Sequence, residues 1–437
     1  MIHKQRLDDY IQQVCNQIRN KEMHASISQE LQGHLEEKIE EYQSTGLTEE
    51  DAIDKAIADM GDPIQVGKHL HQAHKPRMEW SVIALVAVLI GFGLLVMYSL
   101  SQSQTDAGHL FTNKVVGILL GLGLFIALLF FDYRKLQPYS LYLYLGIVLC
   151  MLLTLPFGTT VNGRPMYLNL GFLFVNVYGM CSVLLILSMA GMFAAWNWEK
   201  RKTLLWAALV FLVPFIFLIA SNHAFEAFLI LAGFLVLMAA SPAPRRSVLE
   251  LFGVLFVAIT GVAFLMIKQY QLHRILSFLD PHADPNGTGY TLLQSLKALQ
   301  EAGLWGHGFG ASLNTLPGTE AELVFAYIVH SFGLVTGAAI LLLGIILLVR
   351  LLRAVRLVRD RYGVMLMSGF MTLFFIPYFW SILMTAGFLP IMSANLPFIS
   401  YGNTSFLMQM LLIGLVLNVY RRKDMQPIEA CKPPVQN

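Results

Sequence analysis

The residue types best suited to chemistry gather in one polar segment of this chain, residues 270–325, which lies between two apolar runs. Its candidate residues are Asp280 and Asp284, each followed by proline, Tyr290 at the end of a Gly-x-Gly-Tyr turn, Gln294, and Glu322, where the chain re-enters an apolar run. Long loops in compact domains usually carry function. An ionisable residue at a membrane boundary is by default a candidate site residue. The segment therefore predicts a site built around Glu322.

Two further polar segments are expected to face the same site. One contains Arg164 and precedes the fourth apolar run; the other, residues 396–405, contains Ser400 and Tyr401. Glycines and prolines let these segments leave helical geometry, which a membrane tolerates only against protein or a wet cavity. Together with Arg274 of the long loop they predict a cavity lined by cations. Arginines suit a phosphate group, and a carboxylate suits a general base or a ligand for a divalent cation such as Mg²⁺ or Mn²⁺.

Each of these residues also has a simpler interpretation. Arg164 and Arg274 could extend to lipid phosphates at the membrane surface. Glu322 could cap the helix that follows it, where the helix dipole favours a negative charge. His330 could be an ordinary hydrogen-bonding residue between helices.

Composition sets the class of protein. Hydrophobic residues make up 56% of the chain and charged residues 13%, which is typical of a helical membrane protein with several spans. We therefore expect membrane lipids, and not nucleic acid, among its partners. The four cysteines show neither pairing nor metal-ligand spacing, so we expect no disulfide framework. No signal peptide is expected, because the first 77 residues are polar.

Ten apolar runs are each about long enough to cross a hydrocarbon layer of about 30 Å. They are 80–100, 115–131, 138–155, 171–196, 204–220, 224–240, 249–267, 323–352, 364–385 and 404–420. The eighth is too long, because 30 helical residues extend about 45 Å. We expect a bend near Gly333 or Gly337 and an amphipathic first third that projects from the membrane. The predicted fold is all-α, with ten transmembrane helices.

Lysine and arginine are distributed unequally between the two sets of loops. One set holds fifteen: Arg134, Lys135, Lys200, Arg201, Lys202, Arg245, Arg246, Arg350, Arg353, Arg356, Arg359, Arg361, Arg421, Arg422 and Lys423. The other holds five: Lys114, Arg164, Lys268, Arg274 and Lys297. Because positively charged loops stay inside, we expect a plasma-membrane protein with both termini in the cytoplasm and residues 268–322 outside. The basic cluster 350–361 is also expected to contact anionic lipids.

Residues 1–77 are predicted to form a separate cytoplasmic domain. Apolar residues recur at helical spacing from Leu7 to Ile18 and from Leu31 to Tyr42. Thr48 is placed to cap a third helix that ends at Gly61, and a short fourth helix would cover 64–73. So small a core suggests a domain that docks a partner or acts as a stabilising cap. The membrane domain then covers 78–423, and 424–437 form a cytoplasmic tail.

Several short motifs occur together in the membrane region. They are Arg274-Ile275-Leu276, Leu279-Asp280-Pro281, Asp284-Pro285, Gly289-Tyr290, Gln294-Ser295, Gly303-Leu304-Trp305-Gly306, residues 321–326, and 396–402. This combination resembles the SEDS family of RodA, FtsW and SpoVE, over about residues 80–423. The prefix separately resembles, through Met60-Gly61-Asp62-Pro63, the helical permease-prefix domains of Firmicutes membrane proteins.

The resemblance implies a ten-span peptidoglycan glycosyltransferase of cell shape, division or sporulation. Such proteins polymerise lipid II, a disaccharide-pentapeptide on undecaprenyl pyrophosphate, usually with a class B penicillin-binding protein. The family's essential aspartate aligns with Glu322, which would deprotonate the acceptor hydroxyl while cations, with or without Mg²⁺ or Mn²⁺, stabilise the departing pyrophosphate. The substrate-binding residues implied are Arg164, Arg274, Asp280, Asp284, Tyr290, Gln294, His307, Ser400 and Tyr401.

Three functions remain open at this point. Glu322 replaces an aspartate of the family, which weakens the catalytic assignment. The family's Gln-Pro-Asp-Leu-Gly is absent, with Ser221-Asn222-His223 nearby, and His330-Ser331 replaces a pair of glutamates. These two substitutions favour an inactive relative that acts as scaffold or regulator of a penicillin-binding protein. Retention of the complete Asp-Pro loop favours an active lipid II polymerase. The third function, transport of the lipid-linked precursor, predicts charges deep in the spans and repeated halves. Glu226 is the main buried charge and no repeat is visible, so we expect the polymerase before the regulator and transport last.

Overall fold

The computed structural model describes residues 2–18, 24–73, 78–103, 108–161, 164–169, 174–266, 276–313 and 315–423. The chain forms two compact units, Met1–Met78 with Tyr420–Asn437, and Glu79–Val419. We call residues 1–78 the prefix domain and residues 79–419 the membrane domain.

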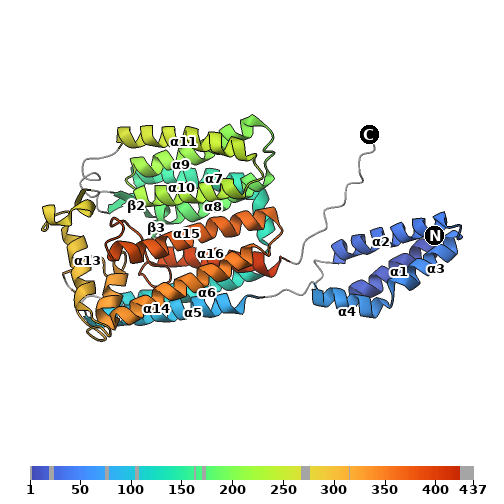
Figure 1. Ribbon diagram of the computed structural model, residues 1–437, viewed down its shortest axis with the longest axis horizontal. Coiled ribbons are helices and arrows are strands. Elements are labelled where there is room, and N and C mark those ends of the chain that lie inside the picture. The colour runs from blue at the N-terminus through green and yellow to red at the C-terminus, as the bar shows by residue number, and fades with distance from the viewer. Residues whose placement is uncertain are drawn as a thin grey trace. The chain divides into compact units, whose positions relative to one another are not determined.

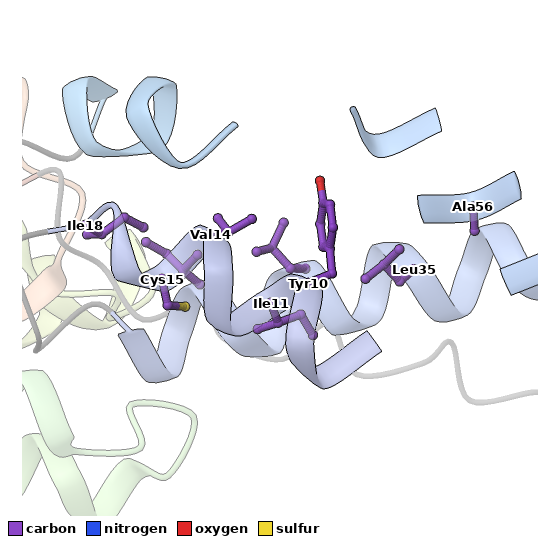
Figure 2. Packing of buried hydrophobic residues seen from close by; sticks show 9 residues of the cluster. Tyr10, Ile11, Val14, Cys15, Ile18, Leu35 and Ala56 are labelled. Carbon is purple, nitrogen blue, oxygen red and sulfur yellow. The ribbon is translucent and has the colours of Figure 1, made fainter. Parts of the chain in front are cut away.

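Four helices make up the prefix domain: α1 (Ile2–Asn16), α2 (His24–Ser44), α3 (Glu49–Met60) and α4 (Pro63–Ala73). The apolar residues predicted from helical spacing form its core. Tyr10, Val14 and Leu35 are 4%, 0% and 1% exposed, and Figure 2 shows them together with Ala56 of α3. This core lies on one face of each helix, as the 3.6-residue period requires.

The start and end of α3 follow the predicted capping pattern. Thr48 Oγ1 accepts a hydrogen bond from the Asp51 N–H at 3.3 Å, and α3 ends at Gly61, whose φ of 85° suits glycine. The Tyr42 hydroxyl of α2 donates to the Asp59 carboxylate of α3. This hydrogen bond favours the charged carboxylate and lowers the pKa of Asp59.

Ten helices of the membrane domain correspond to the ten predicted apolar runs. They are α5 (Trp80–Ser103), α6 (Gly108–Phe130), α7 (Ser140–Phe157), α8 (Val177–Ala195), α9 (Arg201–Ala220), α10 (Ala224–Ala240), α11 (Arg245–Met266), α14 (Val324–Val355), α15 (Arg361–Thr385) and α16 (Asn403–Arg421), with a 3₁₀ turn η2 (Tyr133–Tyr139) before α7. Eight described segments are long and apolar enough to cross a membrane; α10 is shorter, at 17 residues, and the side chains at the end of α11 lie outside the described residues. The chain is a multi-pass, all-α membrane protein.

The helices run side by side, and α8 and α15 lie at the centre of the bundle (Figure 1). The helix α8 packs against α7, α10 and α15, while α15 also packs against α14. A glycine permits the close approach of α14 and α15, because a Cβ on Gly344 of α14 would lie 2.2 Å from the Tyr378 ring of α15. The Tyr378 hydroxyl donates to the Ile340 carbonyl at 2.7 Å, so the same contact pairs a buried polar group.

The long helix α14 bends at Gly333, as predicted, with φ 87° and ψ 169°. The expectation that its first third projects as an amphipathic helix is wrong. Val324–Val329 are 5% exposed or less, because α14 packs against α15, α5 and α13 (Tyr290–Glu301). The excess length is therefore buried in protein.

One end of the bundle carries α13, which lies across the helix ends, and a small sheet (Figure 1). We call it the α13 end. The sheet is antiparallel in the order β1 (Thr159–Val161), β2 (Arg164–Asn169), β3 (Phe174–Asn176), with Tyr167 opposite both Thr159 and Asn176. A 3₁₀ turn η3 (Pro281–Ala283) precedes α13.

The sheet was not predicted, and it shortens the fourth span. That span begins at Val177 rather than at Gly171, because Asn176 ends β3 and caps α8: its Oδ1 accepts a hydrogen bond from the Gly179 N–H at 2.8 Å. Residues 170–173 lie outside the described residues.

Candidate functional site around Glu322

A tight turn between α15 and α16, residues 396–402, forms the base of the candidate site. The Leu396 N–H donates to Ser400 Oγ at 2.8 Å, and the Phe398 N–H donates to Gln409 Oε1 at 2.7 Å. Phe398 has a φ of 64°, an uncommon value for a residue with a side chain. Its conformation is held from two sides, since Gly93 of α5 packs so closely that a Cβ there would lie 2.6 Å from the Phe398 carbonyl oxygen.

A buried lysine of α6 donates hydrogen bonds to this turn. Lys114 is 2% exposed, and its Nζ donates to the carbonyl oxygens of Phe398 and Ser400, both at 2.8 Å. The ammonium also lies 4.8 Å from the centre of the Phe406 ring. Carbonyl dipoles and a ring face thus replace the water that the charge has lost. Counting Lys114 among the loop residues was wrong, because α6 begins at Gly108 and places it inside the helix.

The 396–402 turn also positions the segment that carries Glu322. Ser400 Oγ donates to the Ala321 carbonyl at 2.8 Å, and the Tyr401 N–H donates to the Glu320 carbonyl at 2.8 Å. Ser381 Oγ of α15 reaches the Glu322 carbonyl at 3.5 Å. The backbone carbonyls of residues 320–322 are therefore all fixed, and we call these residues the rigid strip. Glu322 is its last residue, at the α13 end, and its side chain is half-buried.

Glu322 does not cap α14 in the way that its position suggested. The N-cap residue is Leu323, and no side-chain capping hydrogen bond is made there. The carboxylate still lies one residue before the N-cap, where the helix dipole favours negative charge.

Tyr401 links this strip to the first residues of α6. Its hydroxyl accepts a hydrogen bond from Asn113 Nδ2 at 2.9 Å, and its ring meets that of His109 edge-on at 6.3 Å. The structure thus places Ser400 and Tyr401 against the backbone that leads into Glu322, and adds α6 to this region.

A glycine-rich loop braces α14 at its bend. The bend breaks the helical ladder, and the loop 303–308 replaces the lost bonds: the N–H groups of His307 and Gly308 donate to the His330 and Ser331 carbonyls, both at 2.9 Å. Only glycine fits at the contact, since a Cβ on Gly333 would lie 2.1 Å from the Leu304 carbonyl oxygen.

His307, predicted to bind substrate, lies in this loop with its side chain exposed. Its ring is 4.4 Å from that of His330, at an angle of 48°. His330 Nδ1 is buried and makes no hydrogen bond, so its interpretation as an ordinary hydrogen-bonding residue between helices does not hold at that nitrogen.

The two aspartates of the Asp-Pro steps serve their own turns. Asp280 Oδ1 accepts from the His282 N–H at 3.2 Å, and Asp284 Oδ2 accepts from the Thr288 N–H at 2.9 Å. Both aspartates are exposed. The described contacts therefore place them in the loop that leads into α13, and do not join them to Glu322.

The helix α13 carries the other two predicted residues of the loop. The Tyr290 hydroxyl donates to the Thr315 carbonyl at 2.8 Å, and Gln294 is half-buried one turn later. Ser295 Oγ donates to the Thr385 carbonyl at 3.0 Å and so fixes α13 across the end of α15. These contacts hold α13 across the ends of the membrane helices.

The two arginines expected to line the site cannot be placed. Arg164 begins β2, but its side chain lies outside the described residues, as does all of Arg274. Lys114 is the cation that the described residues bring next to the turn. An ionisable residue within a span is a candidate by default, so a correct start for the second span would have pointed to Lys114.

The part of the chain that the structure describes contains no preformed cage for a divalent cation. Among the described residues no three His, Cys, Asp or Glu side chains come together as metal ligands would. Magnesium is commonly held by one or two carboxylates completed by substrate phosphates and water. Glu322 offers one such carboxylate, and this fits a cation shared with a pyrophosphate.

A model of the FtsW, RodA and SpoVE family, described as cell cycle proteins, matches residues 79–425. This chain belongs to that family. The SEDS membership predicted from the motifs is confirmed, and the matched residues cover the membrane domain without the prefix domain.

Curated relatives from the FtsW/RodA/SpoVE family extend over the same part of the chain. The probable peptidoglycan glycosyltransferase FtsW of Coxiella burnetii is 31% identical over 379 residues, which cover 79% of this chain and 98% of the relative. The peptidoglycan glycosyltransferase MrdB of Escherichia coli K12 is 25% identical over 361 residues, covering 80% and 95%.

Solved structures of the family share the fold. One is a chain from the work on "structural coordination of polymerization and crosslinking by a peptidoglycan synthase complex", with a TM-score of 0.67 and 23% identity over 79% of this chain and 98% of that chain. The rod shape determining protein RodA of Thermus thermophilus has a TM-score of 0.57 and 21% identity, covering 79% and 97%.

Proposed function

We propose that this protein is a peptidoglycan glycosyltransferase of bacterial cell-wall synthesis. Family membership and the names of its relatives support this class of reaction. The observation that carries the proposal is the rigid strip 320–322, held by Ser400, Tyr401 and Ser381, which presents a half-buried carboxylate at the α13 end. Preorganisation of this kind is what a catalytic base requires.

Lipid II is the substrate that this site would use. An acceptor sugar hydroxyl attacks the anomeric carbon that carries undecaprenyl pyrophosphate, so that one C–O bond forms as the C–O bond to pyrophosphate breaks. Glu322 takes the hydroxyl proton. A basic residue then stabilises the negative charge of the leaving pyrophosphate; we assign this role to Arg164 and Arg274. A bound Mg²⁺ or Mn²⁺ would neutralise the same charge.

The α13 end lies on the outer face of the membrane in this proposal. Positively charged loops stay inside, and the fifteen basic residues of the predicted inner loops all adjoin helix ends opposite the α13 end. With Lys114 assigned to α6, the outer loops retain four basic residues. Among these four, the structure describes the side chain of Lys297. Both termini, and with them the prefix domain, are then cytoplasmic.

A penicillin-binding protein is the proposed partner. One structure of the same fold comes from work on a peptidoglycan synthase complex that couples polymerization and crosslinking. A class B penicillin-binding protein supplies the crosslinking reaction that such a complex needs. The prefix domain is proposed to dock a separate cytoplasmic partner, since its residues lie outside the family match.

A second function is favoured by specific contacts. Asp280 and Asp284 are used to cap their own turns, and His330 and Ser331 stand where the family resemblance has two glutamates. A relative that keeps the fold without turnover would act as a scaffold or regulator of the penicillin-binding protein.

Glycan-chain formation from lipid II separates these functions. The purified full-length protein is incubated with lipid II alone, and then with a candidate class B penicillin-binding protein whose binding is measured in parallel. Each reaction is run with Mg²⁺, with Mn²⁺ and with chelator. Polymer in any partnered reaction supports the glycosyltransferase. If the protein still binds its partner but no polymer forms in any condition, the glycosyltransferase proposal is wrong and the regulator function takes its place.

A further inference from the structure

A cavity with a partly polar lining lies in the membrane domain, apart from the Glu322 carboxylate. Its volume is ≈ 100 Å³, and it lies between α8, α10, α15, α16 and the segment 393–397, helices that are neighbours in Figure 1. Its polar lining residues are Ser182, Glu226, Ser393, Asn395, Ser405 and Gln409. Polar side chains gathered within a membrane bundle usually mark a path or a site for a polar species.

The carboxylate of Glu226 lies next to His223, which is its ion-pair partner when the imidazole is protonated. His223 is 1% exposed, its ring stacks on Tyr178 at 4.0 Å, and its Nε2 donates to the Pro165 carbonyl at 3.0 Å. With Nε2 bound in this way, Nδ1 faces Glu226 Oε2 at 3.7 Å. That separation is beyond hydrogen-bond distance, and Glu226 Oε2 is buried without a hydrogen-bond partner.

A second oxygen in the cavity has no partner either. Asn395 Oδ1 is buried and makes no hydrogen bond, whereas the neighbouring Gln409 Oε1 accepts from the Phe398 N–H. Buried polar atoms are almost always paired, and leaving one without a partner destabilises the folded protein. Both unpaired atoms are acceptors, so either a hydrogen-bond donor or a cation could bind them.

We propose that this cavity binds a monovalent alkali cation, with Glu226 and Asn395 as ligands. A hard cation prefers carboxylate, amide and hydroxyl oxygens, and the cavity offers all three. One carboxylate balances one positive charge; a divalent ion would leave an uncompensated charge in a low-dielectric interior. Sodium is the alkali cation used first in the test, with lithium and potassium compared against it.

The cation would stabilise the turn on which the candidate site depends. Asn395 and Pro397 line the cavity and lead directly into that turn, and Gln409 lines it while bonding to the Phe398 N–H. A ligand that binds only the folded arrangement stabilises it by mass action. The inference does not rest on the proposed function, because stability is measured without substrate.

The test is the thermal unfolding midpoint of the purified full-length protein in detergent, followed by tryptophan fluorescence. Sodium chloride replaces choline chloride at constant total chloride, with lithium, potassium and magnesium chlorides in parallel. We expect a midpoint that rises and saturates with sodium, and a half-saturating concentration at least about tenfold higher in Glu226→Gln, because one ligand loses its charge.

Glu250→Gln is the matched control, since Glu250 is 59% exposed on α11 and paired with Arg246; its sodium response should equal that of wild type. Asn395→Ala provides a second route if Glu226→Gln does not fold, and it too should weaken the response. A midpoint equal in sodium and choline would mean that water fills the cavity, and would overturn the proposal. So would a response to magnesium alone, or a sodium response that Glu226→Gln retains.

Discussion

Lys114 is the residue whose replacement best tests how the candidate site is held together. Lys114→Met keeps the length of the side chain and removes its three donors. The carbonyls of Phe398 and Ser400, each bonded to Nζ at 2.8 Å, would then lie buried without a donor. The turn that they belong to positions the strip carrying Glu322.

The expected loss of stability is small because two effects oppose each other. Two buried acceptors without a donor cost about 1–3 kcal/mol each. Removing a buried ammonium recovers several kcal/mol of desolvation cost. We expect a net loss of about 2 kcal/mol. The effect on catalysis is larger, because a displacement of about 1 Å in a preorganised site can lower the rate about 10²-fold.

The assay combines the thermal midpoint with the rate of glycan formation from lipid II. Lys297→Met is the matched control: Lys297 is 61% exposed on α13 and pairs with Glu301 at 3.8 Å, and such surface pairs contribute about 0–1 kcal/mol. We expect Lys297→Met to behave like wild type. A Lys114→Met protein that keeps both the wild-type rate and the wild-type midpoint would refute the role of the lysine in holding the turn.

Two further predictions concern stability. Gly333→Ala should lower the thermal midpoint, because its φ of 87° costs an alanine about 1–3 kcal/mol in strain before the clash with the loop is added; Gly91→Ala, with open space around it in α5, should leave the midpoint unchanged or raise it. In the prefix domain, Tyr42→Phe removes the hydrogen bond that lowers the pKa of Asp59, so the variant should show faster amide exchange in α2 and α3 at pH 7. The difference from wild type is complete above the ordinary pKa of 3.8 and should disappear as the pH falls through the lowered folded-state pKa. A difference that does not decrease as the pH falls below 3.8 would contradict this assignment.

The helices of the membrane domain could be predicted because each apolar run carries its own signal. About 20 consecutive apolar residues identify a span wherever its partners lie. The bend at Gly333 followed from the excess length of the eighth run and a glycine within it. The projecting amphipathic segment did not follow, since burial of Val324–Val329 depends on helices far away in the sequence, and a helical period does not show which of them pack against it.

The contacts of the candidate site were harder to predict because its partners are far apart in sequence. Lys114 bonds to residues 284 to 286 positions away, and the span boundary set at 115 excluded it. Asp284 had a local signal, however. Its carboxylate accepts from a backbone N–H four residues later, and an Asp-Pro step followed by glycine is typical of such turns. Composition alone cannot separate an aspartate that caps a turn from one that binds a substrate.

The carboxylate assignment is tested most directly by comparing Glu322→Gln with Glu320→Gln in glycan formation from lipid II. Both residues are half-buried in the same strip, and their backbone carbonyls are held alike, by Ser381 and by Tyr401. With Glu322 as the base, Glu322→Gln should lose about 10²- to 10⁴-fold in rate while keeping its thermal midpoint and its binding of lipid II, and Glu320→Gln should polymerise at close to the wild-type rate. Polymer formed by Glu322→Gln at the wild-type rate would contradict the assignment.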